Sequence, residues 1–476
     1  MNSYSKPLCC ALFLLLATLS SACFSQNRIG AGEIKDTYQK FCSNCHGKKL
    51  QGGSGSSLVD DEWKLGSSDA EIAHVIREGA TKLGMPAWKN ALSDEEIRAM
   101  VIFIREQKLI SRKAIVEKTL APKKGVYNAA GEQFKLEVLT KGSDIFWSLA
   151  FMPDQSLLIT QRNGKLFHYK DDKLQQIKGT PKVWRYGQGG LLEVHLHPQY
   201  SSNGWVYLSY SETKDGDTGM TAVSRGRIKN NKWVDEQKIF TTAKNLHTGA
   251  GTHFGSRFVF DNGYLYFAIG DRSRKHQAQD LSKPNGKIHR IHDDGRIPSD
   301  NPFINTKNAI PSIWSYGHRN PQGLDLDPNT GLLWETEHGP RGGDEVNLIE
   351  KGKNYGWPEI TYGMNYSGTP ITEHTHKPGM EQPKHYWVPS IAVAGIDFYQ
   401  GSKFKNWQGK LLVGGMASQE LHLLDIKNNQ VVSDTIVLKN AGRVRDVATG
   451  PDGNIYLLLN RRTPSSSKLA RLVPVN

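Results

Sequence analysis

The chain has 476 residues, of which 22% are charged, and its formal net charge at pH 7 is +13. A chain of this length can bury a large hydrophobic core and has room for more than one domain. It contains only five cysteines, three of them within the first 23 residues and two in one short motif, so a fold built on many disulfides is excluded.

The N-terminus has the pattern of an export signal. Lys6 precedes the apolar stretch Leu8–Leu19, which is too short to span a membrane and ends in the small residues Ser20-Ser21-Ala22. We therefore expect a signal peptide in residues 1–25 and export to the bacterial periplasm or outer surface. Ala22-Cys23 also fits a lipoprotein signal of residues 1–22. Because Ser20 stands where Leu is usual, lipid attachment at Cys23 stays open.

Cys42-Ser43-Asn44-Cys45-His46 is the most specific motif of the chain. In an exported protein, C-x-x-C-H is the attachment sequence of a c-type haem. Two thiols one helical turn apart can each form a thioether with a haem vinyl group, and His46 can then ligate the iron. The alternatives are a disulfide, a zinc pair or a thioredoxin-like site. No second cysteine pair exists for zinc, and no strand-helix-strand pattern surrounds the motif.

The second axial ligand is expected downstream. Met85 lies in Leu83-Gly84-Met85-Pro86, a loop fixed by Gly and Pro that can hold its sulfur against a haem edge. Met100 falls on the apolar stripe of a predicted helix and is assigned to the core, and His74 is a weaker alternative. Met/His ligation raises the haem potential, which suits an iron that receives electrons from an organic donor.

Two terminal helices complete a small cytochrome. One is expected over about residues 33–43 and the other over about 94–108, where Ser93 and Glu96 form a capping box. Residues 26–112 thus resemble a class I cytochrome c domain. Residues 113–133 are polar and are predicted to form an irregular linker.

The remainder, residues 134–476, has the texture of an all-β domain. One pattern recurs: a hydrophobic strand, a turn rich in Pro, Asp, Gly and Asn, and a second β-branched or aromatic strand. It occurs six times, at 149–169, 193–210, 258–271, 324–335, 396–414 and 447–459. Six occurrences with variable connections predict a six-bladed β-propeller.

The positive charge falls mostly on this second domain, since Lys and Arg nearly balance Asp and Glu in residues 26–112. An exported haem protein has little use for nucleic acid, so no nucleic-acid partner is expected. A basic solvated surface explains the excess in part. The alternative is that some of it faces an anionic cofactor.

Several propeller segments resemble the PQQ-dependent soluble glucose/aldose sugar dehydrogenases, the glucose/sorbosone dehydrogenase family. The resemblance covers about residues 134–470 and rests on Gly187-Gln188-Gly189-Gly190-Leu191-Leu192, His253-Phe254-Gly255-Ser256-Arg257, Ala268-Ile269-Gly270-Asp271, Tyr316–Leu324 (YGHRNPQGL), Glu337-His338-Gly339-Pro340 with Asp344-Glu345, Asn354–Pro358 (NYGWP) and Gly442–Asp446 (GRVRD).

The resemblance implies a catalytic base at His253, oriented by Asp271. This agrees with the chemistry, because hydride transfer from an alcohol or hemiacetal needs a base for the hydroxyl proton, and histidine titrates nearest neutrality. An orienting carboxylate fixes the tautomer and stabilises the imidazolium. Gln188 is carried over as a substrate contact near the base.

The resemblance also implies a PQQ site. PQQ bears three carboxylates and a quinone, so planar cationic donors suit it. Arg319 and Asn320 match the family residues near the quinone carbonyls, and Arg319 is also expected to take part in catalysis. Arg443 and Arg445 match the residues that bind the carboxylates. Alternation along a strand would turn both of these arginines to one face. Trp387 either packs over cofactor or sugar or is an ordinary buried tryptophan.

Calcium is the third expected cofactor, beside PQQ and haem c. In this family Ca²⁺ bridges protein and quinone through main-chain carbonyls, here those of Gly339 and Pro340. Glu345 and Tyr355 resemble a second, structural Ca²⁺ site.

Two positions depart from the family. Gly415-Met416-Ala417-Ser418-Gln419 stands where the glucose dehydrogenases have a Lys that contacts the quinone, and Thr252 replaces an acidic substrate contact. The sugar preference is therefore not carried over.

The sequence as a whole predicts an exported quinohaemoprotein that oxidises an aldose at C1 to the lactone. Its electrons would pass from PQQ to the haem and then to a periplasmic or respiratory acceptor. A calcium-dependent propeller hydrolase such as a lactonase, and a non-catalytic propeller that docks the cytochrome, are the alternatives.

Overall fold

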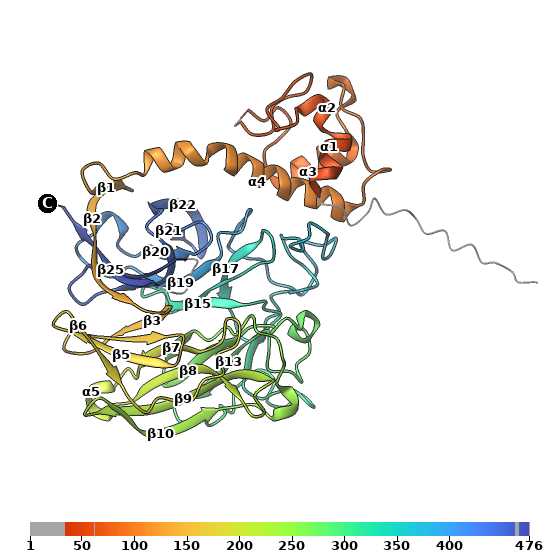
Figure 1. Cartoon of the computed structure of the whole chain (residues 1–476). Coiled ribbons are helices and arrows are strands. Elements are labelled where there is room, and N and C mark those ends of the chain that lie inside the picture. The colour runs from red at the N-terminus through yellow and green to blue at the C-terminus, as the bar shows by residue number, and fades with distance from the viewer. Residues whose placement is uncertain (1–33, 61, 462–465, 476) are drawn as a thin grey trace, which may run out of the picture.

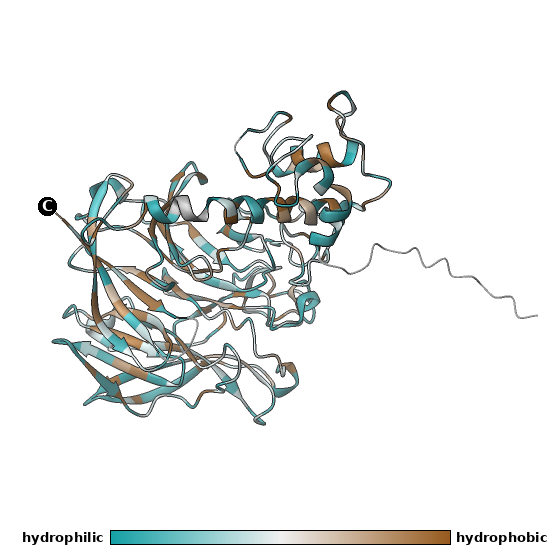
Figure 2. Cartoon of the chain, turned by 45° about the horizontal axis from the view of Figure 1, so that its top comes forward, coloured by the Kyte–Doolittle hydropathy of each residue, from teal (hydrophilic) through white to brown (hydrophobic). Residues whose placement is uncertain are grey.

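The computed structural model describes residues 34–60, 62–461 and 466–475. The predicted signal peptide and Cys23 lie outside these residues. The described chain forms a small helical domain that stands beside a ring of β-sheets, as both views show (Figures 1 and 2). Within the described part, no helix is both long and apolar enough to cross a membrane.

The helical domain consists of α1 (Ile34–Phe41), α2 (Ser43–His46), α3 (Asp69–Glu78), the 3₁₀ turn η1 (Thr81–Leu83) and the first half of α4 (Asp94–Thr119). The capping box is confirmed: Glu96 accepts the Ser93 N–H at 2.8 Å and Ser93 accepts the Glu96 N–H at 3.3 Å. Met100 is buried in the core of this domain, as its place on the apolar stripe predicts.

The predicted irregular linker over 113–133 is wrong in most of its length. Helix α4 continues to Thr119, and β1 (Val126–Ala129) then pairs with β2 (Glu132–Gly142). The reason is local: no Gly or Pro interrupts the chain between Asp94 and Pro122, so nothing in the backbone stops the helix where the apolar stripe ends.

The six-bladed propeller is confirmed, and each recurrent pattern of the sequence forms the first hairpin of one blade. The blades are β3 (Phe146–Phe151), β4 (Leu157–Gln161), β5 (Lys165–Lys170), β6 (Lys173–Ile177); β7 (Leu191–Leu196), β8 (Val206–Thr213), β9 (Gly219–Lys229), β10 (Lys232–Phe240); β11 (Phe258–Asp261), β12 (Tyr264–Ile269), β13 (Lys287–His292), β14 (Ile313–Tyr316); β15 (Pro321–Leu326), β16 (Leu333–Glu337), β17 (Asp344–Ile349), β18 (His385–Trp387); β19 (Val393–Phe398), β20 (Leu411–Gly415), β21 (Glu420–Lys427), β22 (Gln430–Lys439); and β23 (Arg443–Thr449), β24 (Ile455–Asn460), β25 (Ser467–Pro474) with β2 and β1. Short helices α5 (Tyr200–Asn203), η2 (Lys244–Leu246), η3 (Lys275–Ala278) and η4 (Lys405–Trp407) lie in connections.

The ring closes through the sixth sheet, in which β2 from the start of the domain pairs with β25 from its end. Closure of this kind removes the exposed edges of the ring. Neighbouring blades are also joined by buried side chains near the centre. Asp446 accepts the Leu149 N–H at 3.0 Å, and the Thr221 hydroxyl donates to the Phe254 carbonyl at 2.7 Å.

This topology brings the predicted site residues to one rim of the ring. In an antiparallel hairpin, the residues before the first strand lie beside those after the second. Gln188, His253 and Arg319 precede β7, β11 and β15, whereas Asp271 and Gly339 follow β12 and β16. Residues that are far apart in the sequence therefore face a common space.

Candidate active site on the propeller rim and candidate haem pocket

His253 and Asp271 form a pair in which the Asp271 side chain is buried and the His253 side chain is 16% exposed. The Nδ1 atom of His253 lies 2.6 Å from Oδ1 of Asp271, and the other carboxylate oxygen accepts the indole N–H of Trp357 at 2.8 Å. His253 has a φ of 55°, a conformation that is rare outside glycine and concentrates at functional sites. The pair thus leaves Nε2 of His253 as the ring nitrogen available to a substrate.

The electrostatics of the pair suit a neutral base beside an ionised carboxylate. Burial lowers the pKa of His253 below 6.5, an effect that the hydrogen bond with Asp271 opposes and the charge of Arg319 supports. Burial alone would raise the pKa of Asp271, but the hydrogen bond with His253 and the nearby charges bring it below its ordinary value.

Gln188 reaches this pair from the neighbouring blade. Its side-chain oxygen accepts the backbone N–H of His253 at 2.9 Å. The backbone N–H of Gln188 donates to the Gly251 carbonyl at 2.6 Å. Gly187 permits this approach, since a Cβ there would lie 2.1 Å from the Gly251 oxygen. Gln188 therefore holds the backbone of His253 through its side chain.

Arg319 and Asn320 lie on the other side of the pair. The Asp271 N–H donates to the Arg319 carbonyl at 2.7 Å, and the Asn320 side-chain oxygen accepts the Gly255 N–H at 3.2 Å. Burial lowers the pKa of His338 to about 3, and the nearby Arg319, His253 and Arg445 add to this effect. His338 thus marks the point where these groups converge.

Arg445 belongs to a cluster of cations at this point. Burial and the charges of Arg443, Arg257 and Arg162 lower the pKa of Arg445 to about 9. Strand β23 is bulged at Arg445, so simple alternation does not place it, but Arg443 and Arg445 remain neighbours. The Nε atoms of Arg162, Arg319 and Arg445 are buried without a hydrogen-bond partner. Unpaired guanidinium donors of this kind fit a ligand with several carboxylates.

Trp387 lies elsewhere. Its ring packs in the core between blades 4 and 5, and its indole N–H donates to Asp434 at 2.7 Å. None of its described contacts is to His253 or to the arginines. Of the two readings that the sequence left open, the structure supports the ordinary buried tryptophan.

The two carbonyls expected to bind the bridging Ca²⁺ accept hydrogen bonds in the structure. Arg319 Nη1 donates to the Gly339 oxygen at 2.6 Å, and the Ser390 hydroxyl donates to the Pro340 oxygen at 3.0 Å. Each oxygen retains a second lone pair, so both remain candidate ligands.

Glu345 is partly buried and forms, with the buried Glu335 and Glu337, an acidic cluster that fits a cation. Glu335, Glu337 and Glu345 share one face of β16 and β17, and His318, Glu335 and Glu337 present ligand atoms within 4.8 Å of one another. Burial and mutual repulsion raise the pKa values of Glu335 and Glu345 well above normal. The Glu335 Oε1 and Asn347 Oδ1 atoms are buried without a partner, and Glu337, Glu345 and Tyr355 line a small cavity. Unsatisfied oxygen ligands around a small cavity suit Ca²⁺.

Lys439 of the neighbouring strand does not replace the quinone-contacting Lys that is expected at 415–419. Lys439 of β22 is buried and forms an ion pair with Glu420. Thr252, at the other departure, bonds to the Ser273 hydroxyl at 2.5 Å.

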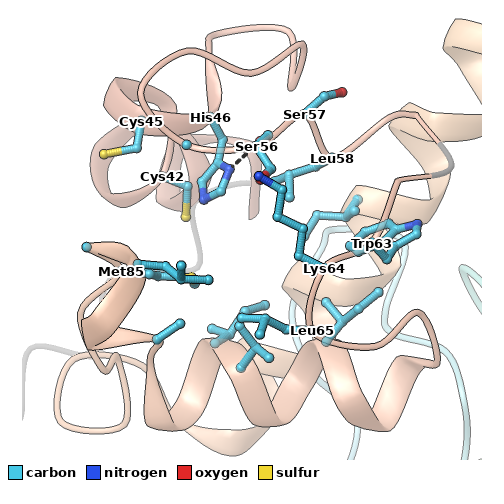
Figure 3. Close-up of a pocket in the computed structure, with 18 of the residues that line it drawn as sticks. Cys42, Cys45, His46, Ser56, Ser57, Leu58, Trp63, Lys64, Leu65 and Met85 are labelled. Carbon is cyan, nitrogen blue, oxygen red and sulfur yellow. Dashed lines mark hydrogen bonds between the residues drawn. The ribbon is translucent and has the colours of Figure 1, made fainter.

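The haem-motif residues share one pocket of the helical domain. His46, Cys42 and Met85 point into it (Figure 3), and its walls include Trp63, Ile72, Met100 and Ile104. His46 Nδ1 lies 2.7 Å from the Ser56 carbonyl. That contact fixes the tautomer and leaves Nε2 for a metal.

Three residues of the propeller site escaped sequence reasoning. Arg272 is fully buried and donates to the carbonyls of Ala250 and Thr252, so it holds the loop before His253. Trp357 bonds to Asp271. The NYGWP string that contains Trp357 was recognised, but no role followed from it. Tyr186, which is 52% exposed and stacks on Trp184, had no signal in the sequence.

Comparison with known proteins agrees with this geometry. A family model described as glucose/sorbosone dehydrogenase matches residues 143–469. The chain belongs to this family. A model described as cytochrome c oxidase, cbb3-type, subunit III matches residues 31–104, so this glucose/sorbosone dehydrogenase family member carries a cytochrome c domain.

Its relatives cover the propeller. The aldose sugar dehydrogenase YliI of Escherichia coli is 44% identical over 357 residues, which are 73% of this chain and 95% of the relative. Quinoprotein glucose dehydrogenase B of Acinetobacter calcoaceticus is 26% identical over 77% of this chain and 93% of its own length. The crystal structure of the soluble aldose sugar dehydrogenase of E. coli in the apo-form matches with a TM-score of 0.69 and 43% identity, over 72% of this chain and 100% of the other. The propeller is therefore that of a PQQ-type aldose sugar dehydrogenase, an oxidoreductase.

Proposed function

We propose that the protein oxidises an aldose at C1 to the lactone and delivers the electrons to its own haem c. The observation that carries this proposal is the hydrogen-bonded His253–Asp271 pair beside three arginines with unpaired buried Nε atoms. The pair supplies a base, and the arginines supply a site for an anionic cofactor. PQQ, when bound there, accepts the hydride, and haem c takes the electrons onward one at a time.

The residues of the chain divide the work. His253 Nε2 takes the proton of the C1 hydroxyl, and Asp271 keeps the ring oriented and stabilises its protonated form. Arg319 and Asn320 would hold the quinone end of the cofactor, and Arg443 and Arg445 its carboxylates. Gln188 positions the base and contacts the sugar.

Metals and haem have candidate ligands of their own. Glu345, with Glu337 and the Tyr355 segment, would hold a structural Ca²⁺, and the Gly339 and Pro340 carbonyls would hold the cofactor's Ca²⁺. Cys42 and Cys45 would attach the haem, while His46 and Met85 would ligate its iron. A haem c requires export, so we place the protein in the periplasm, with a respiratory or periplasmic acceptor as its partner and Cys23 as a candidate lipid anchor.

The test is sugar oxidation by purified protein loaded with PQQ and Ca²⁺, with an artificial dye as electron acceptor. We expect the lactone as product and a fall in kcat of about 100-fold or more in His253→Ala, the usual range for the loss of a general base. Hydrolysis of a lactone by the protein without PQQ, and without reduction of the dye, would favour the lactonase alternative instead. Activity that His253→Ala leaves unchanged would contradict the proposed base.

A further inference from the structure

The cytochrome domain rests on blade 4 through one face of helix α4 (Figure 1). Glu106 accepts two hydrogen bonds from Arg341, at 2.8 and 2.7 Å, and Arg98 donates to the carbonyl of Thr372. Met364 and Val388 of the propeller pack into the cytochrome's own hydrophobic core. We call the contact of α4 and Asp69 with Arg341, Gly342, Tyr362, Met364, Thr372, Tyr386 and Val388 the docking surface.

The docking surface and the propeller site share one loop. Gly339 lines the small cavity beside Glu345 and accepts a hydrogen bond from Arg319. Two residues later Arg341 pairs with Glu106, and a Cβ on Gly342 would lie 3.4 Å from the side chain of Ile102 in α4. The loop 339–343 therefore lines the cavity with both of its ends, Gly339 and Gly343, and contacts the cytochrome with Arg341 and Gly342 between them.

A second connection runs through two stacked tyrosines. Thr361 lines the same small cavity, and the next residue, Tyr362, stacks on Tyr386 with ring centroids 3.8 Å apart. The Tyr386 hydroxyl donates to Asp69 of α3 at 3.3 Å, and Arg105 of α4 donates to the same carboxylate at 2.8 Å. These contacts join the cavity to the cytochrome without a gap.

Burial raises the pKa of Tyr362 to about 12, and the negative charges of Glu345 and Asp69 add to this effect. Tyr362 thus feels the acids of the propeller site and those of the cytochrome at once.

One layer of protein separates the docking surface from the haem pocket. Met100 and Ile104 of α4 line that pocket, whereas Arg98, Ile102 and Glu106 of the same helix face the propeller. An α-helix with its side chains is about 10 Å across. A haem in the pocket would therefore lie one helix away from blade 4.

We propose that the docking surface is the electron exit of the propeller and holds the cytochrome in place as a resident acceptor; this rests on the proposed function. Oxidation of one sugar to the lactone releases two electrons and two protons: one proton leaves the hydroxyl group to His253, and the hydride carries the two electrons and the other proton. The haem iron takes one electron at a time, from Fe(III) to Fe(II), so an external one-electron acceptor must reoxidise it between the two transfers. Each transfer crosses the same fixed contact.

The test reverses the charge of Glu106. In Glu106→Arg, two cations face each other and the contact opens, so haem reduction by sugar should slow about tenfold or more as the high effective concentration of the haem is lost. Dye-linked sugar oxidation should not change. The double variant Glu106→Arg/Arg341→Glu restores the opposite charges and should restore haem reduction. Glu78→Arg, which breaks the Lys89 ion pair within the cytochrome, is the matched control.

A second readout does not depend on activity. Amide hydrogen exchange at residues 341–343 and 384–386 should quicken in Glu106→Arg and return to the wild-type rate in the double variant. Unchanged exchange, or wild-type haem reduction in Glu106→Arg, would overturn the proposal. Faster exchange in a protein that oxidises no sugar even with the dye would instead place the failure in the proposed function, with the docking contact upheld.

Discussion

At the scale of single residues, the site depends on the hydrogen bonds of the Asp271 carboxylate. One oxygen of its carboxylate contacts His253 and the other accepts the Trp357 indole, so both are engaged by donors. The family motifs of the sequence led to His253 and Asp271. They gave no role to Trp357 or Arg272, because a buried Trp or Arg has the same appearance in a sequence whether it packs or positions a base.

Asp271→Asn tests the orienting role. The amide has nearly the same shape but can donate to His253 Nδ1, which favours the wrong tautomer, so kcat should fall by about 10³- to 10⁴-fold. Steady-state kinetics would measure this, with circular dichroism to confirm the fold. Asp261→Asn, at the last residue of β11, is the control and should keep wild-type kcat. An Asp271→Asn enzyme within tenfold of wild type would contradict the role.

The pKa of His253 predicts the acid limb of the pH profile. The base acts when neutral, and its folded pKa lies below 6.5. Dye-linked kcat/KM should therefore hold as the pH falls through 6.5 and decline only at lower pH. The free energy of unfolding should also fall as the pH falls below 6.5. The reason is that His253 binds its proton more tightly in the unfolded chain than in the folded protein. An acid limb centred above 6.5 would be inconsistent with a neutral His253 whose pKa is lowered.

At the scale of elements, the alternation of strands and turns was enough to predict all six blades, because each blade begins with a local hairpin. The end of α4 was mispredicted, since polar composition was taken for a linker although no helix breaker precedes Pro122. The docking surface could not be predicted at all. Glu106 and Arg341 are 235 residues apart, and a charged pair at that separation leaves no local pattern.

The paired strands β16 and β17 predict a calcium effect on stability. The carboxyl groups of Glu335, Glu337 and Glu345 repel one another without a cation. Ca²⁺ should therefore stabilise the fold by about 2.7 kcal/mol at 100 times its Kd. Thermal unfolding in Ca²⁺ and in chelator would show the difference as a shift in Tm. Glu345→Gln should remove most of this shift, and Glu350→Gln, at an exposed position beyond β17, should retain it. Equal shifts in both variants would refute the cation site.

At the scale of the whole molecule, the chain joins the propeller site and the cytochrome domain through one interface. Related propellers such as YliI match the propeller part of this chain over nearly their whole length. The additional domain here contacts blade 4, whose loop 339–343 also faces the site (Figure 1). Helix α4 is followed by β1 and then by β2, the strand that closes the ring. The two domains are thus in direct contact along the proposed electron route.

The haem spectrum gives the most direct test of that account. Wild-type protein loaded with PQQ and Ca²⁺ is mixed with excess aldose in the absence of oxygen and dye, and the ferric-to-ferrous change is followed. We predict that the haem is reduced with the conversion of sugar to lactone, and that it stays ferric in His253→Ala or without PQQ. Sugar consumption by the loaded wild-type protein while its haem stays ferric would contradict the account.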